Sequence, residues 1–244
     1  MAGQLRLDRY LTDMGMGTRS EIKNLIRKGR VAVNGMICRL PEHKVTVGSD
    51  EICLEDKRID YQEYLYYMLN KPAGVVSATR DNAGKTVLDL IGDKQGKDLF
   101  PVGRLDKDTE GLLLITNDGD LAHQLLSPRM HVDKVYYAKV TGKVTAADQG
   151  AFLTGVDIGE EHPTLPAGLV ILSAGDISEI ELTIQEGKFH QVKRMFEAVD
   201  KEVVYLKRLS MGSLRLDRRL APGEYRELTQ EELGCLKQRK DEQQ

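Results

Sequence analysis

Acidic and basic side chains are most densely grouped in one short segment, Gly103-Arg104-Leu105-Asp106-Lys107-Asp108-Thr109-Glu110-Gly111. The apolar run that follows, residues 112–115, has the composition of a buried strand, so the charged segment is expected to form a loop at the start of that strand. A carboxylate held at the mouth of such a loop can act as a nucleophile. Arg104 is close enough in sequence to stabilise the ionised form of Asp106. This loop is the first candidate for a catalytic site.

The same segment also matches part of a calcium-binding loop. Asp106, Asp108, Glu110 and Gly111 occupy positions at which alternating oxygen ligands and a glycine bend the chain around the ion. The twelfth position should supply a bidentate glutamate, but Asn117 stands there. Calcium is therefore disfavoured. The 3 cysteines and 5 histidines are scattered and form no zinc pattern, so we expect no metal site.

A second group of charges lies in the predicted helix near the N-terminus. Thr18 and Glu21 fit a capping box at its start, and Gly29 offers its end. A basic face is expected from the cations on or just beyond this helix: Arg19, Lys23, Arg27, Lys28 and Arg30. A solvated surface is the alternative interpretation. Because nearly all the charges have one sign, contact with nucleic-acid phosphates is favoured.

The net charge of -3 conceals an uneven distribution along the chain. Residues 1–48 hold nine Lys or Arg against four Asp or Glu, and residues 187–219 repeat these counts. Residues 146–186 hold eight acidic residues and no Lys or Arg, so this stretch is expected to face away from a polyanionic partner. The distribution favours a nucleic-acid partner.

The composition is that of a soluble globular chain. It has 244 residues, 41% hydrophobic and 30% charged, which is enough for one large domain or two modest ones. The apolar runs, such as residues 112–115, are far short of the roughly 20 residues that span a bilayer, and the first residues lack an apolar signal segment. We therefore expect a cytoplasmic protein without a membrane span.

The predicted elements indicate an α+β fold. Helical spacing over residues 5–14 precedes the basic helix, and Asn34-Gly35 predicts a tight hairpin between two short strands. Beyond a polar linker at 55–62, strands are expected at 64–69, 112–116, 135–140, 180–184 and 203–209. Helices are expected near 87–91, 120–127 and 190–199. Many connections are too short for parallel crossovers, which favours a mostly antiparallel sheet.

The N-terminal pattern resembles a known RNA-binding module. RLDRYL, TRSEIKNLIRKGRVAVNG and the strand-rich residues to about Leu54 are similar to the S4 domain. The expected organisation is a small S4-like α/β RNA-binding domain with its linker at 1–60, a mostly antiparallel mixed-sheet pseudouridine synthase domain at 61–235, and a charged C-terminal tail at 236–244.

The second domain is assigned from a series of motifs. GRLDKDTEGLLLITNDG resembles the central motif of the RsuA-type pseudouridine synthases, and MLNKPAG, KVY, EGKFHQVKRMF and the LKR strand resemble further motifs of that family in the expected order. The resemblance implies that Asp106 is catalytic, Tyr136 stacks on the target base and Lys193 pairs with the catalytic aspartate. Arg104 would lie near the displaced base and Leu206 beneath the uracil. Further substrate contacts are expected from Asn70, Lys71, Gln191 and Arg194. A structural role is expected for His190.

The resemblance implies an isomerase that converts uridine to pseudouridine in rRNA and needs no cofactor. The stretches EGKFHQVKRMF and LAPGEYRELT favour 16S small-subunit rRNA, where uridine 516 is the family's target. Two alternatives stay open: a synthase acting on 23S large-subunit rRNA, and a non-catalytic rRNA-binding assembly factor. The resemblance does not decide whether the carboxylate attacks C1′ or takes a C2′ proton. A monomer is expected.

Overall fold

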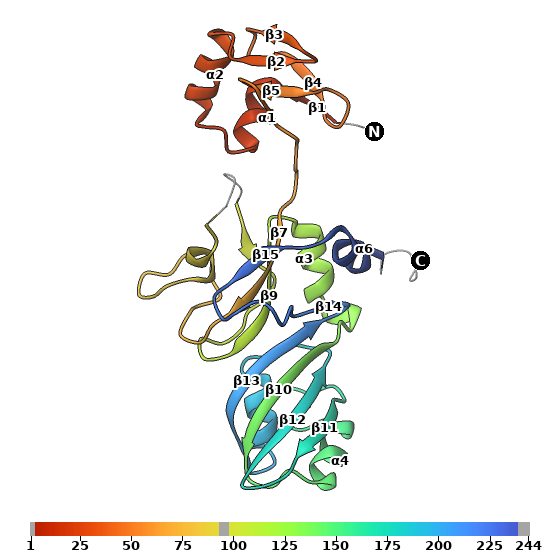
Figure 1. Cartoon of the computed structure of the whole chain (residues 1–244). Coiled ribbons are helices and arrows are strands. Elements are labelled where there is room, and N and C mark those ends of the chain that lie inside the picture. Colours follow the sequence, from red (N-terminus) through yellow and green to blue (C-terminus); the bar gives the residue numbers. More distant parts are fainter. Residues whose placement is uncertain (1–2, 93–97, 239–244) are drawn as a thin grey trace. The chain divides into compact units, whose positions relative to one another are not determined.

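The computed structural model describes residues 3–92 and 98–238. The chain forms two compact units (Figure 1): Met1–Leu65 with Gly92–Leu99, and Tyr66–Ile91 with Phe100–Gln244. None of the helices in the described ranges has the length and apolar character that crossing a membrane requires. Each unit is described by itself below.

The first unit packs two helices against short strands. The helices are α1 (Leu7–Asp13) and α2 (Arg19–Arg27). One sheet has the order β3-β2-β5-β6 and a second pairs β1 with β4. The strands are β1 (Gln4–Arg6), β2 (Val31–Val33), β3 (Met36–Cys38), β4 (Lys44–Thr46), β5 (Ile52–Leu54) and β6 (Lys57–Arg58). Ile22 and Ile26 of α2 are fully buried against Leu7 and Leu11 of α1.

Two local predictions for this unit are confirmed. The backbone N–H of Thr18 donates to the Glu21 carboxylate at 2.8 Å, and the Glu21 N–H donates back to the Thr18 hydroxyl at 3.4 Å, which completes the capping box. Asn34 and Gly35 both have positive φ, 51° and 77°, as a two-residue hairpin turn of this kind requires. The turn therefore fixes the β2–β3 pairing.

The second unit is built on a nine-stranded sheet. Its main path runs β11-β12-β10-β13-β9-β7-β15, while β14 pairs with β13 and β8 with β9. The strands are β7 (Tyr66–Lys71), β8 (Phe100–Pro101), β9 (Glu110–Thr116), β10 (Lys134–Thr141), β11 (Gly168–Ser173), β12 (Ile177–Ile184), β13 (Glu202–Met211), β14 (Leu214–Arg215) and β15 (Tyr225–Glu227). Every pairing is antiparallel except β9 with β13, which confirms the mostly antiparallel α+β prediction.

Helices cover the sheet at two places. The helical segments are η1 (Val87–Leu90), α3 (Gly119–Leu126), η2 (Pro128–Met130), α4 (Ala146–Thr154), α5 (Gln191–Glu197) and α6 (Gln230–Gln238). Leu121 of α3 and Leu236 of α6 share a buried cluster with Met68 and Leu114 of the sheet. Phe152 of α4 and Phe196 of α5 meet edge to face, with 5.0 Å between ring centroids. The first group of helices covers β7 and β9, in which every residue except Glu110 is buried, and the second covers the β11 and β13 part of the sheet.

The predicted C-terminal tail at 236–244 begins too early. Leu236 is 3% exposed and packs into the core from α6, so the helix extends past the expected boundary. Residues 239–244 lie outside the described part of the chain. The helix is mostly polar, which explains why its one buried contact was missed.

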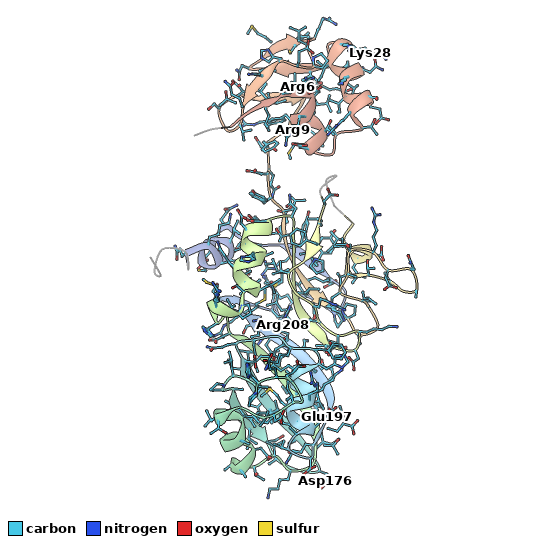
Figure 2. All side chains as sticks on the ribbon, turned by 180° about the vertical axis from the view of Figure 1, so that it is seen from behind. Arg6, Arg9, Lys28, Asp176, Glu197 and Arg208 are labelled. Carbon is cyan, nitrogen blue, oxygen red and sulfur yellow. The ribbon has the colours of Figure 1, made fainter. Side chains whose placement is uncertain are left out.

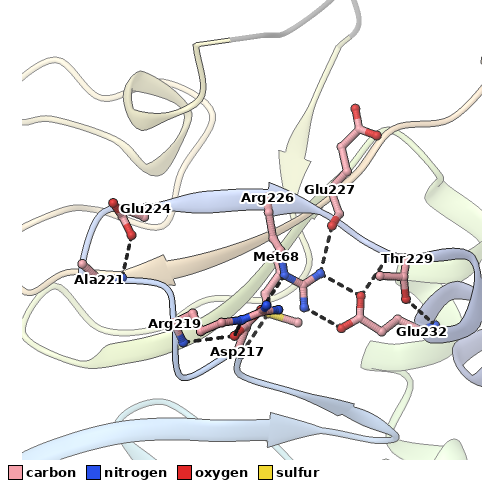
Figure 3. Close-up of polar contacts among 9 residues, drawn as sticks. All are labelled: Met68, Asp217, Arg219, Ala221, Glu224, Arg226, Glu227, Thr229 and Glu232. Atoms are coloured by element: carbon pink, nitrogen blue, oxygen red, sulfur yellow. Dashed lines mark hydrogen bonds and ion pairs between the residues drawn. The ribbon is translucent and has the colours of Figure 1, made fainter.

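An ionic network attaches this C-terminal segment to the sheet (Figure 3). Arg226 on β15 donates to Asp217 at 2.9 Å and to both oxygens of Glu232 at 2.8 and 2.7 Å. Arg219 also donates to Asp217, and together the two guanidinium groups hold the pKa of that carboxyl well below its usual range. The segment is thereby fastened beside β7.

Candidate active site

The loop that carries Asp106 is held from beneath by Lys71, the last residue of β7. The Lys71 side chain is completely buried, and its ammonium donates to the backbone carbonyls of Asp106, Lys107 and Thr109 at 3.0, 3.2 and 2.8 Å. A fourth bond, 3.1 Å long, goes to the carbonyl of Pro72. Burial lowers the pKa of Lys71 to about 8, while nearby carboxylates favour its charged form.

Ser77 braces the same loop from the other side. Its hydroxyl donates to the carbonyl of Leu105 at 2.8 Å and accepts from the N–H of Leu105 at 3.1 Å. The backbone on either side of Asp106 is therefore fixed by buried side chains before any substrate binds. A preorganised carboxylate of this kind needs no rearrangement at the moment of reaction.

A glycine near the start of β9 lets this strand, which follows the Asp106 loop, approach β13 closely. Gly111 has φ +100°, and a Cβ at this position would collide with the backbone oxygen of Arg208 and lie 2.8 Å from its nitrogen. The absence of a side chain permits the parallel pairing of β9 with β13 at Arg208 and Gly111. This contact brings Leu206, two residues earlier on β13, to the Asp106 loop.

Two basic side chains flank the Asp106 carboxylate. Lys193 Nζ lies 3.6 Å from Asp106 Oδ2, and His190 Nε2 lies 3.5 Å from Asp106 Oδ1. Lys193 makes a closer contact with Asp108, at 2.7 and 2.8 Å to its two oxygens, and this pairing lowers the pKa of Asp108. The ammonium predicted to pair with Asp106 is thus shared between two carboxylates.

Asp106 faces a cavity of about 70 Å³. Tyr136 of β10 and Leu206 of β13 form part of its wall, and both side chains are buried, at 7% and 6% exposed. Arg104, whose side chain is exposed, lines the cavity from the loop. The structure therefore brings together Asp106, Arg104, Tyr136, Lys193 and Leu206 as the sequence motifs predict.

Three predicted substrate contacts do not reach this cavity. Lys71 is enclosed beneath the loop, so it contacts backbone rather than ligand. Asn70 is 2% exposed and donates to the carbonyl of Leu220 at 2.8 Å, which places it against the C-terminal segment. Arg194 donates to Glu160 at 2.6 Å and to the carbonyl of Ile158, so it fastens a neighbouring loop. These motif residues support the site rather than line it.

Gln191 lines the cavity, but its amide is engaged within its own loop. Its oxygen accepts from the N–H of Lys188 at 2.9 Å, and its nitrogen donates to Glu186 at 2.8 Å. These bonds shape the turn before α5. Its contact with substrate stays a prediction.

His190 was expected to be structural, yet it lies in the site. Its side chain is 41% exposed and close to Asp106, and it lines the same cavity. Thr109, which the motifs also did not single out, lines the cavity with a buried hydroxyl that has no partner among the described residues. The spacing of EGKFHQ could not show that His190 adopts a left-handed conformation with φ 48° and turns toward the Asp106 loop.

Two further buried basic residues lie near Tyr136 in the sheet: Arg208 is its partner on β13, and Lys134 precedes it by two residues on β10. Arg208 lies within the sheet-containing unit (Figure 2), 2% exposed, and donates to the carbonyl of Leu112 at 2.8 Å. Lys134 is 7% exposed and donates to the carbonyl of Val132. Burial, and then the charge of Arg208, lower the pKa of Lys134. Within residues 3–92 and 98–238 no cluster of His, Cys, Asp and Glu side chains could hold a metal ion.

The predicted basic face is present on the first unit. Arg19, Arg27, Lys28 and Arg30 are exposed and Lys23 is half-buried. Arg30 is paired with Glu55, which reduces its availability. Arg39 belongs to the same surface, because its guanidinium donates to the carbonyl of Arg27 at 3.2 Å. Arg39 lies 12 residues after Arg27 and outside α2, so helical spacing could not predict this contact.

Comparison with known proteins decides the family. Residues 65–198 match RNA pseudouridylate synthase, and residues 5–52 match the S4 domain. The chain belongs to the RNA pseudouridylate synthase family. It is an enzyme that isomerises uridine, and the residues that line the Asp106 cavity lie within the matched residues 65–198 except for Leu206 of β13.

Relatives cover almost the whole chain. An uncharacterized RNA pseudouridine synthase of Bacillus subtilis, YtzG, is 47% identical over 95% of this chain and 98% of its own. The ribosomal large subunit pseudouridine synthase B of Bacillus subtilis is 40% identical over 95% of each chain. The ribosomal small subunit pseudouridine synthase A of Vibrio cholerae is 39% identical over 95% of this chain and 99% of its own. A crystal structure of a pseudouridylate synthase, 38% identical, superposes with a TM-score of 0.67 over 95% of this chain and 99% of that one.

Proposed function

We propose that this synthase converts a uridine of rRNA to pseudouridine, with Asp106 as the carboxylate that meets the ribose. The observation that supports this most is the position of Asp106, between the side chains of Lys193 and His190 and at a cavity walled by Tyr136 and Leu206. The apolar wall suits a flat pyrimidine, and the carboxylate lies where the sugar of that nucleoside would enter. The S4 domain supports an RNA substrate.

The reaction breaks the bond between C1′ and N1, turns the base and joins C1′ to C5. N1 gains a proton and C5 loses one, so the change is an isomerisation with no net redox step. Positive charge develops at C1′ as the first bond breaks, and a fixed carboxylate stabilises it. The cavity walls keep the detached base beside C1′, because a base that escaped would be replaced by water.

The target uridine has to leave its stack to reach this cavity, at a cost of a few kcal/mol. The exposed cation Arg104 lines this cavity and the exposed cation Lys107 lines the neighbouring hollow, so both suit phosphates beside an everted nucleotide. The basic face of the first unit adds contacts that do not depend on sequence. These contacts offset the cost of flipping.

We further propose small-subunit rRNA as the substrate, with uridine 516 of 16S rRNA as the site. The support is local, in two stretches whose sequences favoured this assignment. Residues 186–196 form the turn before α5 and most of that helix, and residues 220–229 contain β15. The large-subunit and small-subunit relatives are similar to this chain to nearly the same extent, so whole-chain identity does not separate the two substrates.

The test is a map of pseudouridine in 16S and 23S rRNA from cells that lack the gene, and from the same cells given the wild-type or the Asp106→Asn protein. We expect one site in 16S rRNA to be lost and then restored by the wild-type protein alone. Loss of a 23S site instead would contradict the small-subunit assignment. An unchanged map in both rRNAs would favour a non-catalytic assembly factor.

A further inference from the structure

Phe189 presents its ring to solvent beside the active site. The residue is 73% exposed, although aromatic side chains usually bury most of their surface. Its ring is stacked on that of His190, with 3.8 Å between centroids and 18° between planes. One face of the Phe189 ring is therefore covered by an active-site side chain.

The backbone that holds this pair is braced. His190 adopts a left-handed conformation, φ 48° and ψ 33°, that few residues other than glycine occupy. Arg194 donates to the carbonyl of Phe189 at 3.1 Å, and Lys188 donates to the carbonyls of His162 and Pro163 at 3.0 and 3.1 Å. These bonds fix the direction of the exposed ring before any ligand binds.

The ring borders a second, larger hollow. This hollow has a volume of about 520 Å³ and is lined by Phe189 and His190 together with Arg104, Asp106 and Lys107. It shares Asp106 and Arg104 with the smaller cavity that Tyr136 lines. A group bound in the larger hollow would therefore lie next to the target nucleoside, whose sugar is proposed to meet Asp106.

We propose that Phe189 is a stacking platform for the nucleobase next to the target uridine in the RNA strand. Every nucleobase has a flat face that stacks on an exposed aromatic ring, and cations beside the ring suit the connecting phosphates. Arg104 and Lys107 supply those cations. The platform holds the strand in register while the target uridine is everted, which makes Phe189 a positioning residue. The inference rests on the proposed function.

Stacking on the ring is tested directly with a ten-nucleotide oligouridine that contains one 2-aminopurine, whose fluorescence falls when its base stacks. The full-length protein and its Phe189→Ala and Phe189→Trp variants are titrated into this probe. We expect wild-type protein and Phe189→Trp to quench the fluorescence and Phe189→Ala to quench it much less. Equal quenching by Phe189→Ala would overturn the platform.

Its role in the reaction is tested with rRNA transcripts. Loss of one stacked base weakens binding by about 5- to 150-fold. We expect Phe189→Ala to raise KM within that range, to change kcat by less than about threefold, and to be rescued by Phe189→Trp. Leu153→Ala removes another exposed apolar side chain, 61% exposed on α4, and should leave KM unchanged.

These outcomes separate the platform from the proposed function. An active wild-type enzyme with an unaltered KM in Phe189→Ala would contradict the platform alone. A wild-type protein that makes no pseudouridine in either rRNA would contradict the proposed function, while the fluorescence titration would still report stacking. A loss in Phe189→Ala that Phe189→Trp does not restore would also contradict the platform.

Discussion

Replacing Lys71 with methionine removes the ammonium group that joins β7 to the Asp106 loop. The volume is nearly conserved, so the change takes away charge and hydrogen bonds rather than packing. Four carbonyl oxygens between 2.8 and 3.2 Å from Nζ lose their shared donor. We expect the loop to lose its fixed position and the protein to lose stability.

The magnitude follows from two opposing contributions. An ammonium can make three hydrogen bonds, each contributing about 1.5–3 kcal/mol, which gives about 4.5–9 kcal/mol in all. Burial of its charge costs about 3 kcal/mol, because the pKa falls from 10.5 to about 8 and each pKa unit corresponds to about 1.4 kcal/mol. The free energy of unfolding of Lys71→Met should therefore fall by about 1–6 kcal/mol.

The assay is urea unfolding of the full-length protein, followed by single-turnover kinetics under conditions where the variant is folded. We expect kcat to fall by about 100-fold, because a displacement of about 1 Å at a reacting group has that effect. Lys143→Met is the control, since Lys143 is exposed, and it should change stability by less than about 0.5 kcal/mol. A Lys71→Met protein with unchanged stability and kcat would refute the role assigned to Lys71.

Three further predictions concern pH, backbone geometry and RNA binding. Between pH 8 and 10.5 the unfolded chain holds the Lys71 proton that the folded chain releases. The unfolding free energy of wild type relative to Lys71→Met should therefore rise by about 2 kcal/mol from pH 7 to 9.5. Urea titration at each pH measures this difference, and a constant difference would contradict the lowered pKa of Lys71. In thermal unfolding, Gly111→Ala should destabilise the protein by about 3 kcal/mol or more, because its Cβ collides with the backbone of Arg208. Its control is Gly150→Ala in α4, whose Cβ would meet no atom within 4 Å. This variant should stabilise the protein by about 0.5–1 kcal/mol. The double variant Arg27→Gln/Lys28→Gln should reduce the slope of log K for RNA binding against log salt concentration by about 1.5. Arg30→Gln should reduce it by less per cation removed, because Glu55 already pairs with Arg30. Equal effects per cation would contradict that distinction.

Elements with a strong hydrophobic period were predicted well. Each of the five strands expected in the second unit overlaps a strand of the structure. The predicted helix at 120–127 overlaps α3, and the one at 190–199 contains α5. The segment near 87–91 forms a 3-10 turn rather than an α-helix. Helix α4 and strand β11 were missed. Residues 148–150 of α4 are polar or glycine and break its apolar pattern. The apolar run 169–172 of β11 does not alternate with polar residues, although Val170 is 55% exposed.

The site residues fall into two groups: those that line the cavity and those that support the Asp106 loop. Motif resemblance placed Asp106, Tyr136 and Leu206 at one cavity, but it could not distinguish a residue that contacts ligand from one that supports the loop. Lys71 shows the difference, because its burial depends on β7 passing beneath residues 106–109. His190 shows the reverse, since its approach to Asp106 depends on a left-handed turn, and the neighbouring Lys188 ties that turn to residues 162 and 163.

The position of Lys193 is an intermediate case. Its motif predicted a pairing with the catalytic aspartate, and the structure places Nζ within 3.6 Å of Asp106. The shorter contact is nevertheless to Asp108, whose carboxylate is 72% exposed and adjusts freely to the ammonium. Sequence spacing could not rank two carboxylates that lie two positions apart on one loop.

Release of tritium from C5-labelled uridine in a 16S rRNA transcript tests the central role of Asp106 most directly. The wild-type protein should release tritium as C1′ joins C5, whereas Asp106→Asn, which keeps the shape of the side chain but removes its charge, should bind the transcript with the same affinity and release none. Tritium release by Asp106→Asn at the wild-type rate would contradict the account.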